Sequence, residues 1–158
     1  MGCAVGHPTP RAAIMFRQSI DVEAEPAALF DLTQDYEHRL EWDPFLREAR
    51  LLDGAEKPGV GVRAWCVSRS GPGMETRYVS FNRPGACAVE MTVGPWFLRS
   101  FSGSWRFDQI EPGRTRVTFT YSVVGRPIVL SSLIRFLFVR ETRRRLEALK
   151  RFAESREG

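Results

Sequence analysis

The chain has 158 residues, of which 43% are hydrophobic and 27% charged, and its formal net charge is +4. These values predict one globular domain and exclude bulk disorder and a fibrous chain. The most apolar run, residues 128–139, contains Arg135 and is shorter than the ~20 residues that a membrane span needs. The first residues lack an apolar signal-peptide core, and three cysteines do not make a disulfide framework. We therefore expect a cytoplasmic protein.

The N-terminal part of the chain predicts a tail, a strand and two short helices. Residues 1–12 are rich in Gly, Pro and Ala without periodicity, which predicts a mobile tail before a single domain over residues 13–158. From Ala13 onward apolar and polar residues alternate, as in a half-buried strand. Pro26 suits the first turn of a short helix. A second helical turn is expected over residues 36–40, before Pro44.

The middle of the chain predicts an antiparallel meander. Short turns rich in Gly and Pro leave no room for the crossover helices of a parallel sheet. The expected strands cover residues 46–52, 60–68, 75–82, 86–93, 99–110 and 114–124. After Gly125-Arg126-Pro127 a long helix is predicted to run to about Ser155.

This order of elements predicts an α+β fold. A seven-stranded curved antiparallel sheet must cover its apolar face, and the long C-terminal helix is the element long enough to do so. The two short helices fall between strands 1 and 2. A curved sheet that grips one helix along part of its length tends to leave an apolar cavity between them.

Four stretches of the chain carry a family resemblance: SIDVEAEPAALFDL, EWDPF, GPWFLRSFSGSWRFDQIEPGRTRVTFTYSV and RETRRRLEALKRF. Through them residues 13–155 resemble the START/SRPBCC helix-grip superfamily, particularly its polyketide cyclase/dehydrase and lipid transport branch. The resemblance implies a cavity for an apolar ligand. These motifs are structural, so they imply little about a reaction.

The inward positions of the strands and of the long helix supply the expected ligand contacts. Pockets of this kind are mostly apolar with a few polar anchors. The expected contacts are Phe16, Trp65, Val79, Phe81, Val89, Met91, Phe101, Phe119, Tyr121, Leu133 and Leu137. Tyr121, Gln18 and Arg63 are candidate polar anchors. The parity of the 60–68 strand is ambiguous: Arg63 points inward if Trp65 does, and both face solvent if Cys66 points inward.

Catalysis and metal binding have little support in the sequence. The chain has two histidines, His7 in the predicted tail and His38 on a short helix, and no metal-ligand spacing, so no metal or cofactor is expected. Cys66 and Cys87 lie in strands separated by another strand, beyond disulfide reach, and are interpreted as structural thiols. Tyr121 and Arg63 are the weak catalytic candidates.

The segment 135–156 has eight basic and three acidic residues. Glu141–Arg145, Arg143–Glu147 and Glu147–Arg151 have i, i+4 spacing, typical of an exposed helix face. The alternative interpretation is peripheral contact with an anionic membrane. Nucleic acid is not expected, because no aromatic residues interleave the basic run. Trp96-Phe97, in a predicted turn, either folds back over the barrel mouth or forms a lip that touches membrane or gates ligand entry.

Three functions are compatible with this pattern. The leading hypothesis is binding or transport of a small hydrophobic molecule, such as a lipid, a quinone or a polyketide-like aromatic. The second is a cofactor-free cyclase, aromatase or dehydratase on the same scaffold. The third is an interaction module that acts through the basic helix.

Overall fold

The computed structural model describes residues 14–126 and 131–158, so the predicted N-terminal tail lies outside the described residues. The strands are β1 (Ile14–Val22), β2 (Leu46–Leu51), β3 (Arg63–Ser68), β4 (Gly73–Asn82), β5 (Ala86–Val93), β6 (Leu98–Glu111) and β7 (Arg114–Gly125). The helices are α1 (Pro26–Gln34), α2 (Arg39–Trp42) and α3 (Ser131–Glu157).

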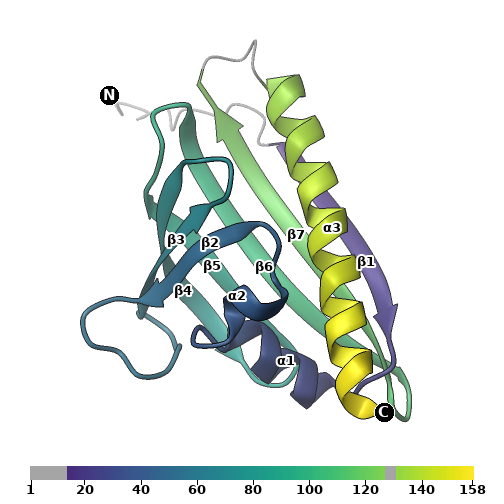
Figure 1. The fold of residues 1–158 in the computed structure, drawn as a ribbon. Helices are drawn as coiled ribbons and strands as arrows, with labels where there is room; N and C mark the ends of the chain where they lie inside the picture. Colours follow the sequence, from purple (N-terminus) through teal and green to yellow (C-terminus); the bar gives the residue numbers. More distant parts are fainter. Residues whose placement is uncertain (1–13, 127–130) are drawn as a thin grey trace, which may run out of the picture.

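The strands form one seven-stranded sheet in the order β1-β7-β6-β5-β4-β3-β2. Every neighbouring pair is antiparallel, so β2 to β7 are a meander and β1 adds to its β7 edge. Register shifts between paired strands occur in β2, β4 and β6. Such bulges bend a strand and increase its twist, which helps the sheet to curl around α3 (Figure 1). The predicted helix-grip fold is confirmed.

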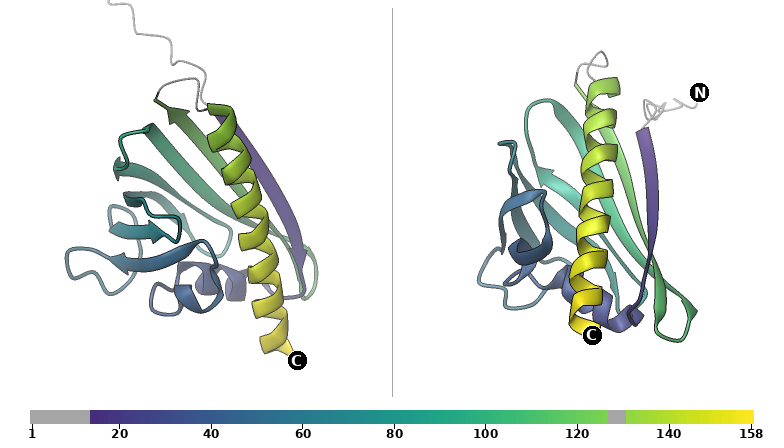
Figure 2. Two further views of the ribbon diagram at one scale, coloured as in Figure 1. Left: turned by 45° about the horizontal axis from the view of Figure 1, so that its top comes forward. Right: turned by 45° about the vertical axis from the view of Figure 1, so that its right-hand side comes forward.

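The long helix α3 runs along the inside of the curled sheet, beside β1 and β7 (Figure 2). Leu146, Leu149 and Ala153, in its second half, are buried in the core. The first half is more open: Leu133, Phe136 and Leu137 are all exposed. The helix is therefore anchored mainly by its C-terminal half. Among the described helices, none is long and apolar enough to cross a bilayer.

Two elements begin three residues later than the sequence predicts. β3 begins at Arg63 rather than at residue 60, because the chain turns at Gly61, which has a φ of +85°. The second helix covers residues 39–42 rather than 36–40. The Asp35 carboxylate accepts hydrogen bonds from the backbone N–H groups of Glu37 and His38, and this side-chain turn delays the helix.

Candidate ligand cavity

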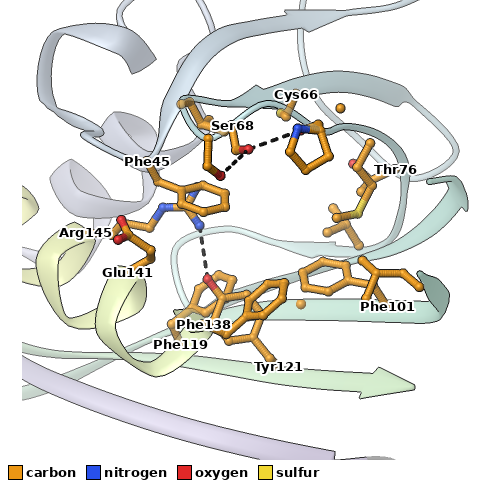
Figure 3. Close-up of a pocket in the computed structure, with 18 of the residues that line it drawn as sticks. Phe45, Cys66, Ser68, Thr76, Phe101, Phe119, Tyr121, Phe138, Glu141 and Arg145 are labelled. Carbon is orange, nitrogen blue, oxygen red and sulfur yellow. Dashed lines mark hydrogen bonds between the residues drawn. The ribbon is translucent and has the colours of Figure 1, made fainter. Parts of the chain in front are cut away.

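A cavity of about 450 Å³ lies between β3 to β7 and the first half of α3. This volume is within the range of small-molecule sites. Its lining is mainly apolar and includes Phe45, Leu46, Met74, Val89, Phe97, Leu98, Phe101, Trp105, Phe119, Ile134, Leu137 and Phe138. Figure 3 shows the aromatic rings of Phe101, Phe119, Tyr121 and Phe138 gathered on one side, with Arg145 facing them.

Three buried charged residues form an arginine–aspartate cluster at one end of the cavity: Arg39, Asp43 and Arg145. Arg39 Nε donates a hydrogen bond to Asp43 Oδ2 over 2.8 Å, and Arg145 Nε lies 2.9 Å from the same oxygen. The Asp43 side chain is fully buried, whereas both arginines line the cavity. Phe45 contributes its backbone N–H to Asp43 Oδ1 at 3.0 Å. The carboxylate of Asp43 thus pairs with two guanidinium groups, and the three side chains together carry a net charge of +1.

The electrostatics of the cluster favour its charged form. Burial would raise the pKa of Asp43, but the positive charges of Arg145 and Arg39 outweigh it and hold that pKa below its ordinary value. Burial likewise opposes the charge on Arg145, and the Asp43 carboxylate outweighs it, so the pKa of Arg145 is raised. Asp43 and Arg145 therefore both stay ionised at neutral pH.

The Arg145 guanidinium lies over two aromatic rings. Its Cζ lies 4.9 Å from the ring centroid of Phe45 and 5.8 Å from that of Phe119. Its Nη1 donates a hydrogen bond to the hydroxyl oxygen of Tyr121 over 3.3 Å (Figure 3). Because the Tyr121 oxygen accepts this bond, its own O–H is left as a donor. Arg145 and Tyr121 together present N–H and O–H donors at this end of the cavity.

A second buried polar group lines the cavity next to Arg39, because Gln34 Nε2 donates to the hydroxyl of Thr33 and Arg39 donates to the backbone carbonyl of the same residue. The Tyr78 hydroxyl donates to Gln34 Oε1 over 2.6 Å, and the Tyr36 and Tyr78 hydroxyl oxygens are 3.0 Å apart. Since Tyr78 gives its proton to Gln34, Tyr36 donates to Tyr78. Burial raises the pKa of Tyr36 to about 12 and that of Tyr78 further, so both phenols are neutral.

Several expected ligand contacts do line the cavity. The structure places Phe101, Phe119, Tyr121, Leu137 and Val89 there. They come from three neighbouring strands and from α3. They share this cavity because strand alternation and the position of α3 put their side chains on one side of the sheet.

Three other expected contacts are buried or half-buried elsewhere. Phe16 lies in a groove between β1 and α3, with the Arg135 guanidinium 5.4 Å from its ring centroid. Phe81 packs its ring against Phe30 of α1, 5.0 Å between centroids. Met91 packs on the core over Gly94, beyond the cavity lining. Gln18, expected as an anchor, instead donates to the backbone carbonyl of Val139.

The remaining expected contacts point away from the cavity. Cys66 lines it, so by strand alternation Trp65 and Arg63 lie on the opposite face of β3. In β4, Thr76 and Tyr78 face inward and Val79 is exposed; the bulge between Tyr78 and Ser80 then turns Phe81 inward again. Leu133 is 57% exposed on the open part of α3.

Arg63 does not line the cavity, contrary to its prediction as a polar anchor and weak catalytic candidate. Its guanidinium donates to Asp53 Oδ2 over 2.8 Å and to Glu75 Oε1 over 2.9 Å. Both partners lie with it on the outer face of the sheet edge. Of the two predicted catalytic candidates, Tyr121 is the one that lines the cavity.

The sequence pattern does not predict the arginine–aspartate cluster. The i, i+4 spacing predicts a pair of Arg145 with Glu141 on a solvated face. Arg145 instead turns inward to Asp43, and Glu141 lies 3.6 Å from Arg144. A signal was present: Arg145 follows Phe138 by seven residues and precedes Leu149 by four, which places it on the apolar stripe of the helix. The two other predicted pairs, 143–147 and 147–151, do not form among the described residues, where Lys150 pairs with Glu154 at 2.7 Å.

The described residues offer one weak grouping of metal-ligand types, Asp35, Glu37 and His38, near the surface. Its geometry is explained without an ion, because Asp35 accepts bonds from two backbone N–H groups and lies 2.7 Å from His38 Nδ1. Cys66 and Cys87 are free thiols on the cavity wall.

The fold and its cavity define a helix-grip protein of the START/SRPBCC superfamily. Residues 13–154 match the family model described as polyketide cyclase/dehydrase and lipid transport. The chain belongs to this family. No match was found among curated proteins.

Similar solved structures share the fold at low sequence identity. The Zhui aromatase/cyclase from Streptomyces sp. R1128 has a TM-score of 0.80 and 16% identity, covering 93% of this chain and 97% of that one. A START superfamily protein from Mycobacterium smegmatis has a TM-score of 0.78 and 13% identity over 91% and 99% of the two chains. Norcoclaurine synthase from Thalictrum flavum, in complex with dopamine and hydroxybenzaldehyde, has a TM-score of 0.71 and 8% identity over 91% and 88%.

Proposed function

We propose that the protein binds a small hydrophobic molecule, a lipid, a quinone or a polyketide-like aromatic, in the cavity between the sheet and α3, and carries it. The observation behind this proposal is the cavity of about 450 Å³, whose walls are mainly aromatic and aliphatic. Water in such a cavity is poorly hydrogen-bonded, so an apolar ligand gains by replacing it. The family description, which includes lipid transport, supports the same function.

The test uses a neutral fluorescent probe, N-phenyl-1-naphthylamine, and two variants of α3. Leu137 lines the cavity, whereas Leu133, one turn earlier on the same helix, does not. Both side chains are partly exposed, so Leu137→Trp and Leu133→Trp should both fold. We expect the indole at position 137 to weaken probe binding about tenfold and the indole at 133 to leave it unchanged. Equal affinities of the two variants would show that the probe binds elsewhere.

A second candidate function is a cofactor-free cyclase, aromatase or dehydratase on the same site. The observation that favours it is the pairing of Arg145 with the Tyr121 hydroxyl, since donors of this kind can polarise a ketone carbonyl for attack by an enolate carbon. The test is the product distribution of a short aromatic poly-ketone incubated with the protein. Enzyme function predicts a change that is lost in Tyr121→Phe; a distribution that Tyr121→Phe leaves unchanged would remove this assignment.

Peripheral contact with an anionic membrane is proposed for the open end of α3. Leu133, Phe136 and Leu137 are exposed there, and the exposed Arg140 and Arg144 follow on the same helix. Apolar side chains beside basic ones suit an anionic lipid surface. Co-flotation with phosphatidylserine vesicles should fall steeply with salt and with Phe136→Ser. Binding that is insensitive to both would contradict this contact.

A further inference from the structure

We infer that the ligand carries an anionic or ionisable oxygen, such as a phenolate, enolate or carboxylate, and that Arg145 and Tyr121 bind that oxygen. This inference rests on the proposed function, because it names the chemical class of the ligand of the same cavity. Two buried guanidinium groups share the single carboxylate of Asp43, so one positive charge is left for the cavity.

The other charged groups at the cavity do not cancel this excess. Glu141 also lines the cavity, but its carboxylate lies 3.6 Å from the guanidinium of Arg144. Arg69 adds a further positive charge at the exposed rim. A buried, incompletely neutralised cation is unfavourable in an apolar site unless an anion or a strong acceptor joins it.

The geometry also favours an acceptor over a donor. The Arg145 guanidinium lies over the rings of Phe45 and Phe119, and its N–H groups point outward in its own plane. Within the described part of the chain, the one hydrogen bond that this guanidinium donates goes to Tyr121, whose O–H is then available as a donor. Two donors next to each other fit one oxygen with several lone pairs. A hydrogen-bond donor of the ligand at this position would face the N–H and O–H hydrogens of the protein and would make no hydrogen bond with them.

The buried phenols of the cavity wall cannot supply the missing negative charge. Tyr36 and Tyr78 are linked by a hydrogen bond, and burial keeps both protonated. Cys66 and Cys87 also stay protonated, since burial raises the pKa of each thiol. The anion that balances the remaining positive charge of the cluster therefore comes from the ligand.

The test compares two probes with the same ring skeleton: 8-anilinonaphthalene-1-sulfonate, which is anionic, and N-phenyl-1-naphthylamine, which is neutral. A charge-assisted hydrogen bond corresponds to at least about tenfold in affinity. We expect Arg145→Gln to weaken the sulfonate probe by that factor and to change the neutral probe less than about twofold. Arg140→Gln removes one charge from an exposed position of the same helix and should affect neither probe by more than about twofold.

Each outcome separates this inference from the proposed function. If the wild-type protein binds neither probe, the proposed function fails and the inference fails with it. If both probes bind and Arg145→Gln weakens them equally, or weakens neither, the cavity stands and the inference is overturned. Arg145→Gln leaves Asp43 paired with Arg39, so the variant retains a neutral cluster and is expected to fold.

A measurement on the wild-type protein keeps the inference testable without any variant. The phenol 4-methylumbelliferone reports its ionisation by absorbance. A purely apolar cavity would raise the pKa of the bound phenol, whereas an excess cation lowers it. We expect the bound phenol to ionise at least about one pH unit below the free phenol; ionisation at or above the pH of the free phenol would overturn the inference.

Discussion

Replacement of Asp43 by asparagine tests the arginine–aspartate cluster most directly. Asparagine keeps the size of the side chain and removes its charge. Arg39 and Arg145 would then be two buried cations without a counterion, both within 3 Å of one neutral amide. Removal of one partner from a buried ion pair typically costs about 3–5 kcal/mol in the free energy of unfolding. We expect a loss in that range for Asp43→Asn.

Urea denaturation measures this loss. With a slope of about 2 kcal/mol per molar urea, the midpoint should fall by about 1.5–2.5 M. The matched control is Asp31→Asn, because Asp31 binds Arg83 over 2.7 Å but both side chains are more than half exposed. Solvent screens that pair, so its loss should be far smaller. Equal midpoints for the two variants would refute the argument from burial.

The pH dependence gives an independent check on the same residue. In the folded protein the pKa of Asp43 lies below its ordinary value, against the opposing effect of burial, because of Arg145 and Arg39. A carboxylate with a lowered folded pKa stabilises the protein above its unfolded pKa, about 3.9, and this contribution is lost as pH falls through the folded pKa. The stability difference between wild type and Asp43→Asn should therefore shrink from pH 7 to pH 3. A difference that grows on acidification would contradict the assignment.

Three further predictions concern the core and the cavity wall. Leu149→Ala removes a fully buried side chain and should cost about 2–5 kcal/mol by urea denaturation; a loss under about 1 kcal/mol would mean that α3 is not anchored there. Tyr78→Phe removes the hydrogen-bond donor of Gln34 Oε1 and should lower the free energy of unfolding by about 1–3 kcal/mol. Tyr36→Phe removes only the first hydroxyl of this hydrogen-bond chain and should cost less; the reverse order would contradict the donor direction. Burial raises the pKa of Cys87 to about 12, so iodoacetamide at pH 8 should label it far more slowly in the native than in the urea-unfolded protein, as followed by peptide mapping; equal rates would refute its burial.

The fold was predictable because its signals are local and repeated. Alternation of apolar and polar residues marked the strands, and short turns with Gly and Pro required an antiparallel meander. It was harder to predict which side chains of β3 and β4 face the cavity. The sequence of β3 allowed either parity, and the bulge after Tyr78 changes which side of the sheet Val79 and Phe81 occupy. A bulge has no reliable sequence mark, because it depends on how two strands pair.

The cluster at the end of the cavity was not predictable from periodicity alone. Arg39, Asp43 and Arg145 come from two elements far apart in the chain, and each residue by itself is typical of a surface. Arg145 stood on the apolar stripe of α3, but a basic residue among other basic residues gave no reason to expect burial. Its partner is defined only by the packing of α2 against α3.

The uneven anchoring of α3 has a consequence for how this scaffold can diversify. Its second half packs into the core through Leu146, Leu149 and Ala153, whereas its first half covers the cavity and is exposed to solvent. Substitutions in the first half change which ligands fit the cavity at little cost in stability. Substitutions in the second half are constrained by the core. Selection for a new ligand can therefore act on one end of a single helix while the other end preserves the fold.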